Sequence, residues 1–292
     1  MAKLFRIQRR GKSGVTLSRS RGGSVAIFLF LVAASVFMVL PVVYTIVTAF
    51  KPIHEIFYWP PRFFVREPTL ENFTVLFEIT QDMWVPLERY IFNSVFVSVV
   101  GTALYVFVAS AAAYPLAKYR HKFLDVMYVI VVLAIMFRPE VTRIPTYIII
   151  NSLGLVNTYA SMILPVLAGS FGVFLLRQFI VNVPDSMLEA ARIDGASEYY
   201  IYWNIILPLI RPAVLTLVIF TFTTFWNMSG AEYIYDESMR SLASVLTMVA
   251  AGGIARAGAG AAVALLMMIP PYAVFIFSQA SVMETMAHSG IK

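Results

Sequence analysis

The residues of this chain with the most specific spacing lie between Glu189 and Pro208. A single carboxylate is followed by two alanines, and after three further residues by a glycine. A carboxylate can make a charge-assisted contact with an arginine or lysine of another protein, and small neighbouring side chains let a second surface approach closely. The pattern therefore favours recognition of a protein partner. Its fixed positions are Glu189, Ala190, Ala191, Gly195, Ile205, Leu207 and Pro208.

Two short helices joined at a glycine are expected to carry this pattern. Ser186 and Glu189 fit a capping box at the start of the first helix, and Gly195 can end that helix because it tolerates positive φ. Asp194 is predicted to cap the second helix, which Pro208 then disturbs. The capping signals alone would also fit an ordinary helical hairpin between two membrane spans. The whole spacing is more specific than its caps.

Composition places the chain in a membrane. Its residues are 60% apolar and 13% charged, against about 45–50% and about 25% in soluble domains. The net charge of +6 comes from basic residues beside apolar runs, where they set orientation rather than bind nucleic acid. The chain has no cysteine, and its three histidines are far apart. These facts exclude disulfides and thiolate sites and give a metal site little support.

The apolar runs predict an all-α membrane protein with six transmembrane helices. Residues 1–23 form a basic tail, and residues 24–292 form the transmembrane domain. The first apolar run is too long for a signal peptide, whose apolar core has about 7–15 residues. With both termini in the cytoplasm, most of the 22 lysines and arginines and the loop 184–208 lie on the cytoplasmic side. The expected spans are 24–50, 91–117, 124–142, 159–181, 212–231 and 258–283.

The third span is the least regular of the six. Its apolar run ends at residue 137, after roughly 21 Å of helix, and Arg138 and Glu140 follow at once. These charges lie either just outside the bilayer or along a polar cavity at membrane depth, since charged groups in membranes face partners or water. In the fourth span, Pro165, Gly169 and Gly172 predict an interrupted helix.

Two residues near the end of the fifth span could contact a carbohydrate. The ring of Trp226 can stack on the C–H groups of a sugar, and the amide of Asn227 can donate and accept hydrogen bonds. The same side chains would equally suit an interfacial tryptophan and an asparagine that packs helices. Both interpretations remain open.

The pattern from Glu189 to Pro208 resembles the cytoplasmic EAA loop of permease subunits in ATP-driven (ABC) importers that work with an extracytoplasmic binding protein. Every fixed position of that loop is filled. The resemblance implies a type I ABC importer permease fold, in which the loop forms coupling helices that seat on an ATPase subunit. Glu189, Ala190, Ala191, Asp194, Gly195, Ile205, Leu207 and Pro208 are the coupling residues that it implies.

Other segments look like the carbohydrate branch of these permeases, the maltose-permease-like subunits. They include Asn93-Ser94, the run from Ser152 to Leu155 and the run from Phe171 to Gln178. Residues 284–292 are similar to a subgroup for oligosaccharides of plant and algal polysaccharides, including acidic alginate or pectin fragments. After Asn227, the chain departs from the usual pattern of a glutamate and a bulky aromatic. The substrate-pathway candidates are Asn93, Arg138, Glu140, Trp226 and Asn227.

The resemblance implies a multi-pass protein of the bacterial inner membrane, in contact with lipid and with several protein partners. These are a second homologous permease, two ATPase subunits that bind ATP and Mg, and an extracytoplasmic sugar-binding protein that delivers an oligosaccharide. The chain itself would bind no cofactor and catalyse nothing. Two alternatives are a permease of the same class for an amino acid or peptide, and an ion-coupled secondary transporter. The second alternative usually requires acidic residues within the membrane.

Overall fold

The computed structural model describes residues 21–60, 62–81 and 85–289, and within them every regular element is a helix. Most of the basic tail predicted at 1–23 and the last three residues lie outside this part. The chain divides into two units, residues 1–45 and 46–292. The first unit contains most of α1 (Arg21–Ala49), an apolar helix in which Ser35 donates a hydrogen bond to the carbonyl of Leu31.

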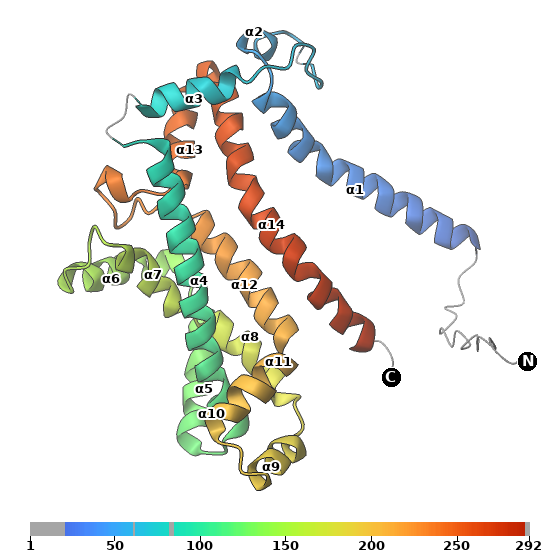
Figure 1. Cartoon of the computed structure of the whole chain (residues 1–292), viewed down its shortest axis with the longest axis vertical. Helices are drawn as coiled ribbons and strands as arrows, with labels where there is room; N and C mark the ends of the chain where they lie inside the picture. Colours follow the sequence, from blue (N-terminus) through green and yellow to red (C-terminus); the bar gives the residue numbers. More distant parts are fainter. Residues whose placement is uncertain (1–20, 61, 82–84, 290–292) are drawn as a thin grey trace, which may run out of the picture. The chain divides into compact units, whose positions relative to one another are not determined.

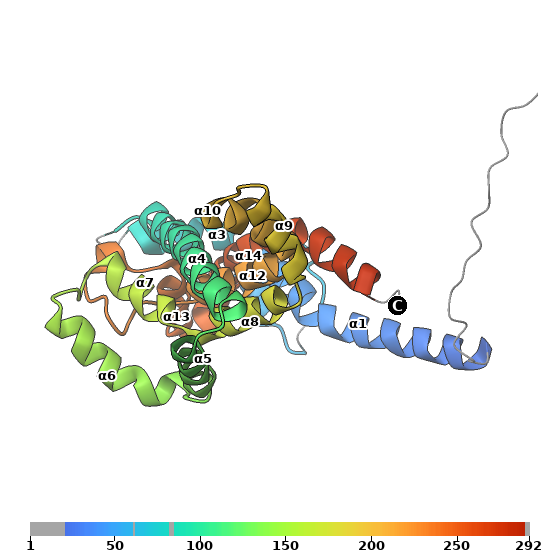
Figure 2. The same cartoon turned by 90° about the horizontal axis from the view of Figure 1, so that it is seen from below.

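The second unit is built around α4 (Leu87–Lys118), the long helix that runs through its centre in Figure 1. This helix packs against α7 (Tyr159–Leu167), α8 (Ser170–Val181) and α12 (Arg211–Trp226). Gly101 permits the close approach of α12, because a Cβ at this position would lie 2.6 Å from the ring of Phe225. α14 (Ala257–Ser289) covers α12 on another side, and Figure 2 shows the group from below.

Three helices of the described chain, α1, α4 and α14, are long and apolar enough to cross a membrane. Two further spans result if each bent pair of helices is one span. One pair is α7 with α8, bent by 44°, and the other is the segment 198–209 with α12, bent by 79°. The break between α7 and α8 falls at Ala168 and Gly169, where the proline and glycines predicted an interruption.

The region predicted as the third span holds two helices. α5 (Lys122–Ile135) is followed by α6 (Pro139–Ser152), and Arg138 stands at the N-cap between them. Pro139 suits the first position of a helix because its missing N–H would have no partner there. Residues 139–142, expected to continue the third span, therefore begin a separate helix.

The stretches expected as external loops also contain helices. α2 (Ile53–Ile56) and α3 (Glu71–Gln81) lie before α4. Between α12 and α14 lie η2 (Glu237–Met239), α13 (Leu242–Ala250) and η3 (Gly253–Arg256), where the sequence predicted only a loop. Val245 and Val249 of α13 are fully buried in a cluster with residues of α4, α12 and α14. Packing against these helices thus stabilises a helix too short to span a membrane.

Candidate functional site

The first half of the loop 184–208 forms α9 (Asp185–Ile193). The helix ends as predicted at Gly195, which has φ of +84°. The N–H of Ala196 donates to the carbonyl of Ala191 at 2.9 Å, and the N–H of Gly195 donates to that of Arg192 at 3.0 Å. These two bonds form a Schellman motif, which satisfies carbonyls left free by the helix end.

The predicted caps of the two helices were wrong. Pro184 stands at the N-cap of α9 without a side-chain bond, so Ser186 lies inside the helix rather than in a capping box. The second helix, α10 (Glu198–Ile201), is capped by Ser197, whose hydroxyl accepts from the N–H of Tyr200 at 3.2 Å. Asp194 is instead the C-cap of α9, because the turn at Gly195 and Ala196 separates it from the start of α10.

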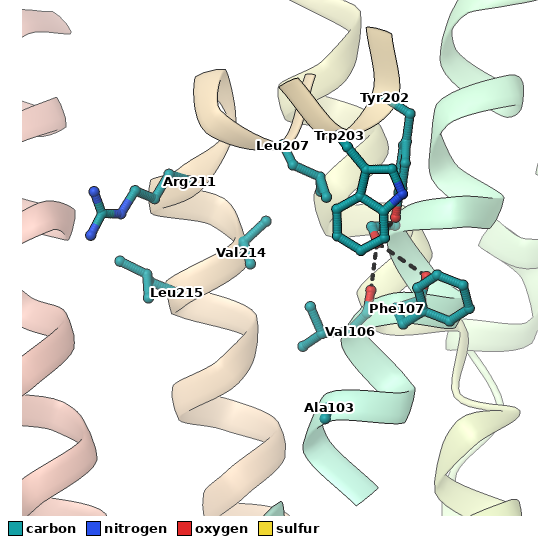
Figure 3. A pocket seen from close by; sticks show the side chains of 10 residues that line it. Ala103, Val106, Phe107, Tyr202, Trp203, Leu207, Arg211, Val214 and Leu215 are labelled. Atoms are coloured by element: carbon teal, nitrogen blue, oxygen red, sulfur yellow. Dashed lines mark hydrogen bonds between the residues drawn. The ribbon is translucent and has the colours of Figure 1, made fainter. Parts of the chain in front are cut away.

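The second half of the loop continues as a π-helix, η1 (Tyr202–Ile206), and a short turn, α11 (Leu207–Leu209). Pro208 has no N–H to continue the regular i→i−4 pattern, and the wider π turn comes directly before it. Figure 3 shows this segment over an apolar hollow of about 270 Å³, with Trp203 beside Phe107 of α4. The hydroxyls of Tyr202 and Ser110 lie 2.6 Å apart there, which fixes the π turn on α4.

One face of the loop is anchored in the interior of the second unit. Leu188, Ile201 and Ile206 are fully buried in a cluster with residues of α4, α8 and α12. Three motif residues, Ala191, Ile205 and Leu207, are partly buried against the same cluster. The apolar positions of the motif therefore hold the loop in place.

The opposite face of the loop is open. Glu189 and Ala190 are exposed, and the side chain of Ile193 is 86% exposed. Among the described residues, the carboxylate of Glu189 has no hydrogen bond or ion pair. An exposed surface that carries Ile193 and the free carboxylate of Glu189 can accept an apolar or basic patch of another protein.

Tyr114 and Lys118, both near the end of α4, make polar contacts with the loop. The Nε of Arg192 donates to Oε1 of Glu198 at 2.7 Å, and the hydroxyl of Tyr114 donates to Oε2 at 2.7 Å. These bonds lower the pKa of Glu198 to about 2. The ammonium of Lys118 donates to Asp185 at 2.7 Å and lowers the pKa of that carboxyl below its usual range. Sequence reasoning missed these contacts, since it used Lys118 only as a mark of orientation.

Two of the substrate-pathway candidates hold parts of the second unit together. The side chain of Trp226 is 2% exposed, and its Nε1 donates to the carbonyl of Met267 at 2.8 Å. The amide of Asn93 donates to the carbonyls of Ser238 and Arg240 and accepts from the hydroxyl of Tyr159. These contacts explain the burial of both residues. Their role in a substrate pathway stays a prediction.

The other three candidates lie at the surface. Arg138 and Glu140 are exposed at the start of α6, with the Nε and Oε2 atoms 4.0 Å apart. Asn227 is exposed at the C-cap of α12. The structure therefore does not gather the five candidates around one cavity.

A second hollow lies between α6 and the turn that follows α12. It measures about 310 Å³ and is lined by aromatic, charged and apolar side chains. Sequence reasoning did not single out this group as a site, because its members come from segments nearly ninety residues apart. The lining residues are Arg143, Ile144, Tyr147, Ala231, Glu232, Tyr233 and Tyr235.

Solved structures of similar shape come from ABC importers. One is a bacterial ABC transporter involved in the import of the acidic polysaccharide alginate, with a TM-score of 0.76 and 19% identity, covering 90% of this chain and 98% of that chain. Another is an inward-facing MetNI methionine transporter, with a TM-score of 0.54 and 16% identity, covering 70% and 97%. At these identities the likeness shows the fold alone: the fold of an ABC importer permease.

Related sequences show the family. Protein LplC of Bacillus subtilis is 31% identical over 80% of this chain and 79% of its own. The polygalacturonan/rhamnogalacturonan permease YtcP of the same organism is 31% identical over 75% of each chain. The sn-glycerol-3-phosphate permease UgpE of Yersinia enterocolitica is 32% identical over 66% and 70%. Residues 16–282 match the binding-protein-dependent transport system inner membrane component family. The chain belongs to this family and is a non-catalytic transport subunit rather than an enzyme.

Proposed function

We propose that this chain is a permease subunit of an ATP-driven importer of oligosaccharides and forms half of the translocation pathway. The observation that carries the proposal is the loop 184–208, whose apolar residues are anchored in the interior while Glu189 stays exposed and has no ion pair or hydrogen bond with any described residue. A surface fixed in this way suits the transfer of motion from a partner protein to the membrane helices.

The assembly that we propose has a second homologous permease, two ATPase subunits carrying ATP and Mg, and an extracytoplasmic sugar-binding protein. A solved structure of similar fold supports the last partner: it is a bacterial alginate ABC transporter in complex with an alginate pentasaccharide-bound periplasmic protein. In this arrangement α5 is the third of six spans, both termini lie in the cytoplasm, and the protein is a multi-pass component of the bacterial inner membrane. The contact with the ATPase would involve Glu189, Ala190 and Gly195.

The mechanism that we propose is alternating access. Closure of the ATPase dimer around ATP would draw the coupling loops of the two permeases together. Since Lys118 and Tyr114 tie the loop to α4, this movement would reach the helices that enclose the pathway. ATP hydrolysis would then release the loops and reset the helices.

An oligosaccharide is the substrate class that the relatives favour. The relatives include a polygalacturonan/rhamnogalacturonan permease. They also include an arabinooligosaccharide permease from Halalkalibacterium halodurans, which is 33% identical over 54% of this chain. The sn-glycerol-3-phosphate permease makes a phosphorylated polyol the competing solute.

The test is ATP hydrolysis by the co-purified complex in lipid with its binding protein. The panel consists of arabinotriose, trigalacturonate, alginate trisaccharide, sn-glycerol-3-phosphate and methionine. We expect stimulation by at least one oligosaccharide. Stimulation by sn-glycerol-3-phosphate or methionine alone would overturn the assignment of a carbohydrate substrate. It would not contradict the assignment of the chain as an importer permease.

A further inference from the structure

We propose that the hollow between α6 and the turn after α12 is a binding site for one uncharged sugar ring of the transported oligosaccharide. This inference rests on the proposed function and adds a contact point and a ligand chemistry to it. We call the hollow the tyrosine cleft. Its residues are Arg143, Ile144, Tyr147, Ala231, Glu232, Tyr233 and Tyr235.

Three tyrosines line the cleft, and the ring of one of them is exposed to solvent. The rings of Tyr147 and Tyr233 stack with centroids 6.4 Å apart and an interplanar angle of 14°, and Tyr233 is only 7% exposed. The hydroxyl of Tyr235 lies 3.1 Å from that of Tyr147, while the side chain of Tyr235 remains 56% exposed. An aromatic ring held in place but left open can stack on the C–H face of a sugar.

An ion pair at the edge of the cleft supplies hydrogen-bonding groups. The Nε of Arg143 lies 2.9 Å from Oε1 of Glu232, and both side chains are partly exposed. The guanidinium has donors beyond the one used in this pair, and the carboxylate can accept further bonds. A sugar hydroxyl, which both donates and accepts, can therefore bond to both partners at once.

The backbone of the cleft is held by an asparagine from another segment. The side-chain Oδ1 of Asn157 accepts from the backbone N–H groups of Tyr235 and Asp236, at 2.6 and 3.1 Å, and the backbone N–H of Asn157 donates to the carbonyl of Tyr233. Asn157 has φ of +60°, a conformation that costs free energy in a residue with a side chain. The turn is thus fixed before any ligand arrives, which lowers the entropy cost of binding.

Charge and size indicate the ligand. The charges of Arg143 and Glu232 cancel, and a carboxylate entering the cleft would compete with Glu232 for the guanidinium. An uncharged ring avoids this repulsion. The volume of about 310 Å³ is at the lower end of the roughly 300–1,000 Å³ found for ligand pockets, which suits one ring of a longer chain.

The position of the cleft fits a step of transport. α12 begins at Arg211, directly after the coupling loop, and ends at Trp226, shortly before the turn that lines the cleft. The cleft and the coupling loop therefore lie at opposite ends of one helix. In the proposed orientation the cleft faces the outside, where the binding protein delivers its sugar.

Direct binding to the purified complex in nanodiscs, without binding protein, tests the cleft. Saturation-transfer NMR with arabinotriose would give the Kd for the wild type, Tyr235→Ala and Tyr235→Phe. We expect Tyr235→Ala to raise the Kd about two- to tenfold, the range that one aromatic stacking contact gives, and Tyr235→Phe to bind nearly as well as the wild type. Trigalacturonate should bind more weakly than arabinotriose.

Tyr58→Ala is the matched control, because Tyr58 is similarly exposed and lies outside the cleft. An unchanged Kd in Tyr235→Ala, an equal loss in Tyr58→Ala, or tighter binding of trigalacturonate would overturn the proposal. ATP hydrolysis with the sugar-loaded binding protein separates the two hypotheses. If sugars stimulate ATP hydrolysis by the wild type but Tyr235→Ala binds arabinotriose normally, the cleft is refuted and the assignment as an importer permease is not.

Discussion

The ammonium of Lys118, the last residue of α4, lies 2.7 Å from Oδ1 of Asp185, the first residue of α9. The same ammonium donates to the carbonyl of Val183 at 2.5 Å. The lysine side chain is 4% exposed, so its charge is stabilised mainly by these two oxygens. A membrane helix and the loop below it are thereby joined at one buried cation.

Replacing Lys118 should weaken the attachment of α9 to α4 without leaving a cavity. Lys118→Met keeps an unbranched side chain of similar length but removes both hydrogen bonds. We expect amide hydrogen exchange in residues 185–193 to become about fivefold faster or more, and sugar uptake to fall. Lys122→Met, at an exposed lysine at the start of α5, is the control. Equal exchange in the two variants would contradict the role of Lys118.

The bond between Arg192 and Glu198 predicts a dependence of stability on pH. The pKa of Glu198 is about 2, against an ordinary value of 4.5. Because the unfolded carboxyl binds a proton more readily, this contribution to stability is complete above pH 4.5 and is lost as the pH falls toward 2. The thermal unfolding midpoint of the detergent-solubilised chain should decrease as the pH is lowered from 4.5 toward 2. The midpoint of Glu198→Gln should decrease less over the same pH range. Parallel curves for the two proteins would refute this account.

Reversing the exposed charge of the coupling loop should separate ATP hydrolysis from transport. The carboxylate of Glu189 has no hydrogen bond or ion pair among the described residues, so Glu189→Lys should leave the fold and the sugar affinity of the binding protein intact. Uptake into proteoliposomes should be lost, since the contact with a basic group of the ATPase would become repulsive. Asp125→Lys, an exposed reversal at the start of α5, serves as the control. Normal uptake by Glu189→Lys would contradict the proposed role of Glu189 in contacting the ATPase.

The turn between the two coupling helices should depend on the backbone of Gly195. A Cβ at this position would meet no atom within 4 Å, so the cost of Gly195→Ala is that of a left-handed conformation, about 1–2 kcal/mol. Gly195→Asn should cost less, because asparagine adopts this conformation more readily. Hydrogen exchange at the end of α9 in the two variants gives the comparison. A smaller effect for alanine than for asparagine would contradict it.

Local signals in the sequence predicted the two-helix loop and the break in the fourth span, because glycine and proline act on the backbone where they stand. The caps were predicted less well. Serine and aspartate can cap wherever the backbone turns, so the geometry after Gly195 decided in favour of Ser197. Sequence spacing could not show the contact between Tyr114 and Glu198 or the tyrosine cleft, since both join segments that only the fold brings together.

The segment 198–209 lies at 79° to α12, so in the proposed mechanism it would act on the helix as a lever. A push on the far end of the segment would rotate α12 about its axis and also shift it along that axis. The π turn at Tyr202–Ile206 lies within this segment. π turns are rare and frequently occur at functional sites, and in the proposed mechanism this turn would absorb part of the movement of the loop. The stiffness of these five residues would then set how much of the ATP-driven movement reaches the tyrosine cleft.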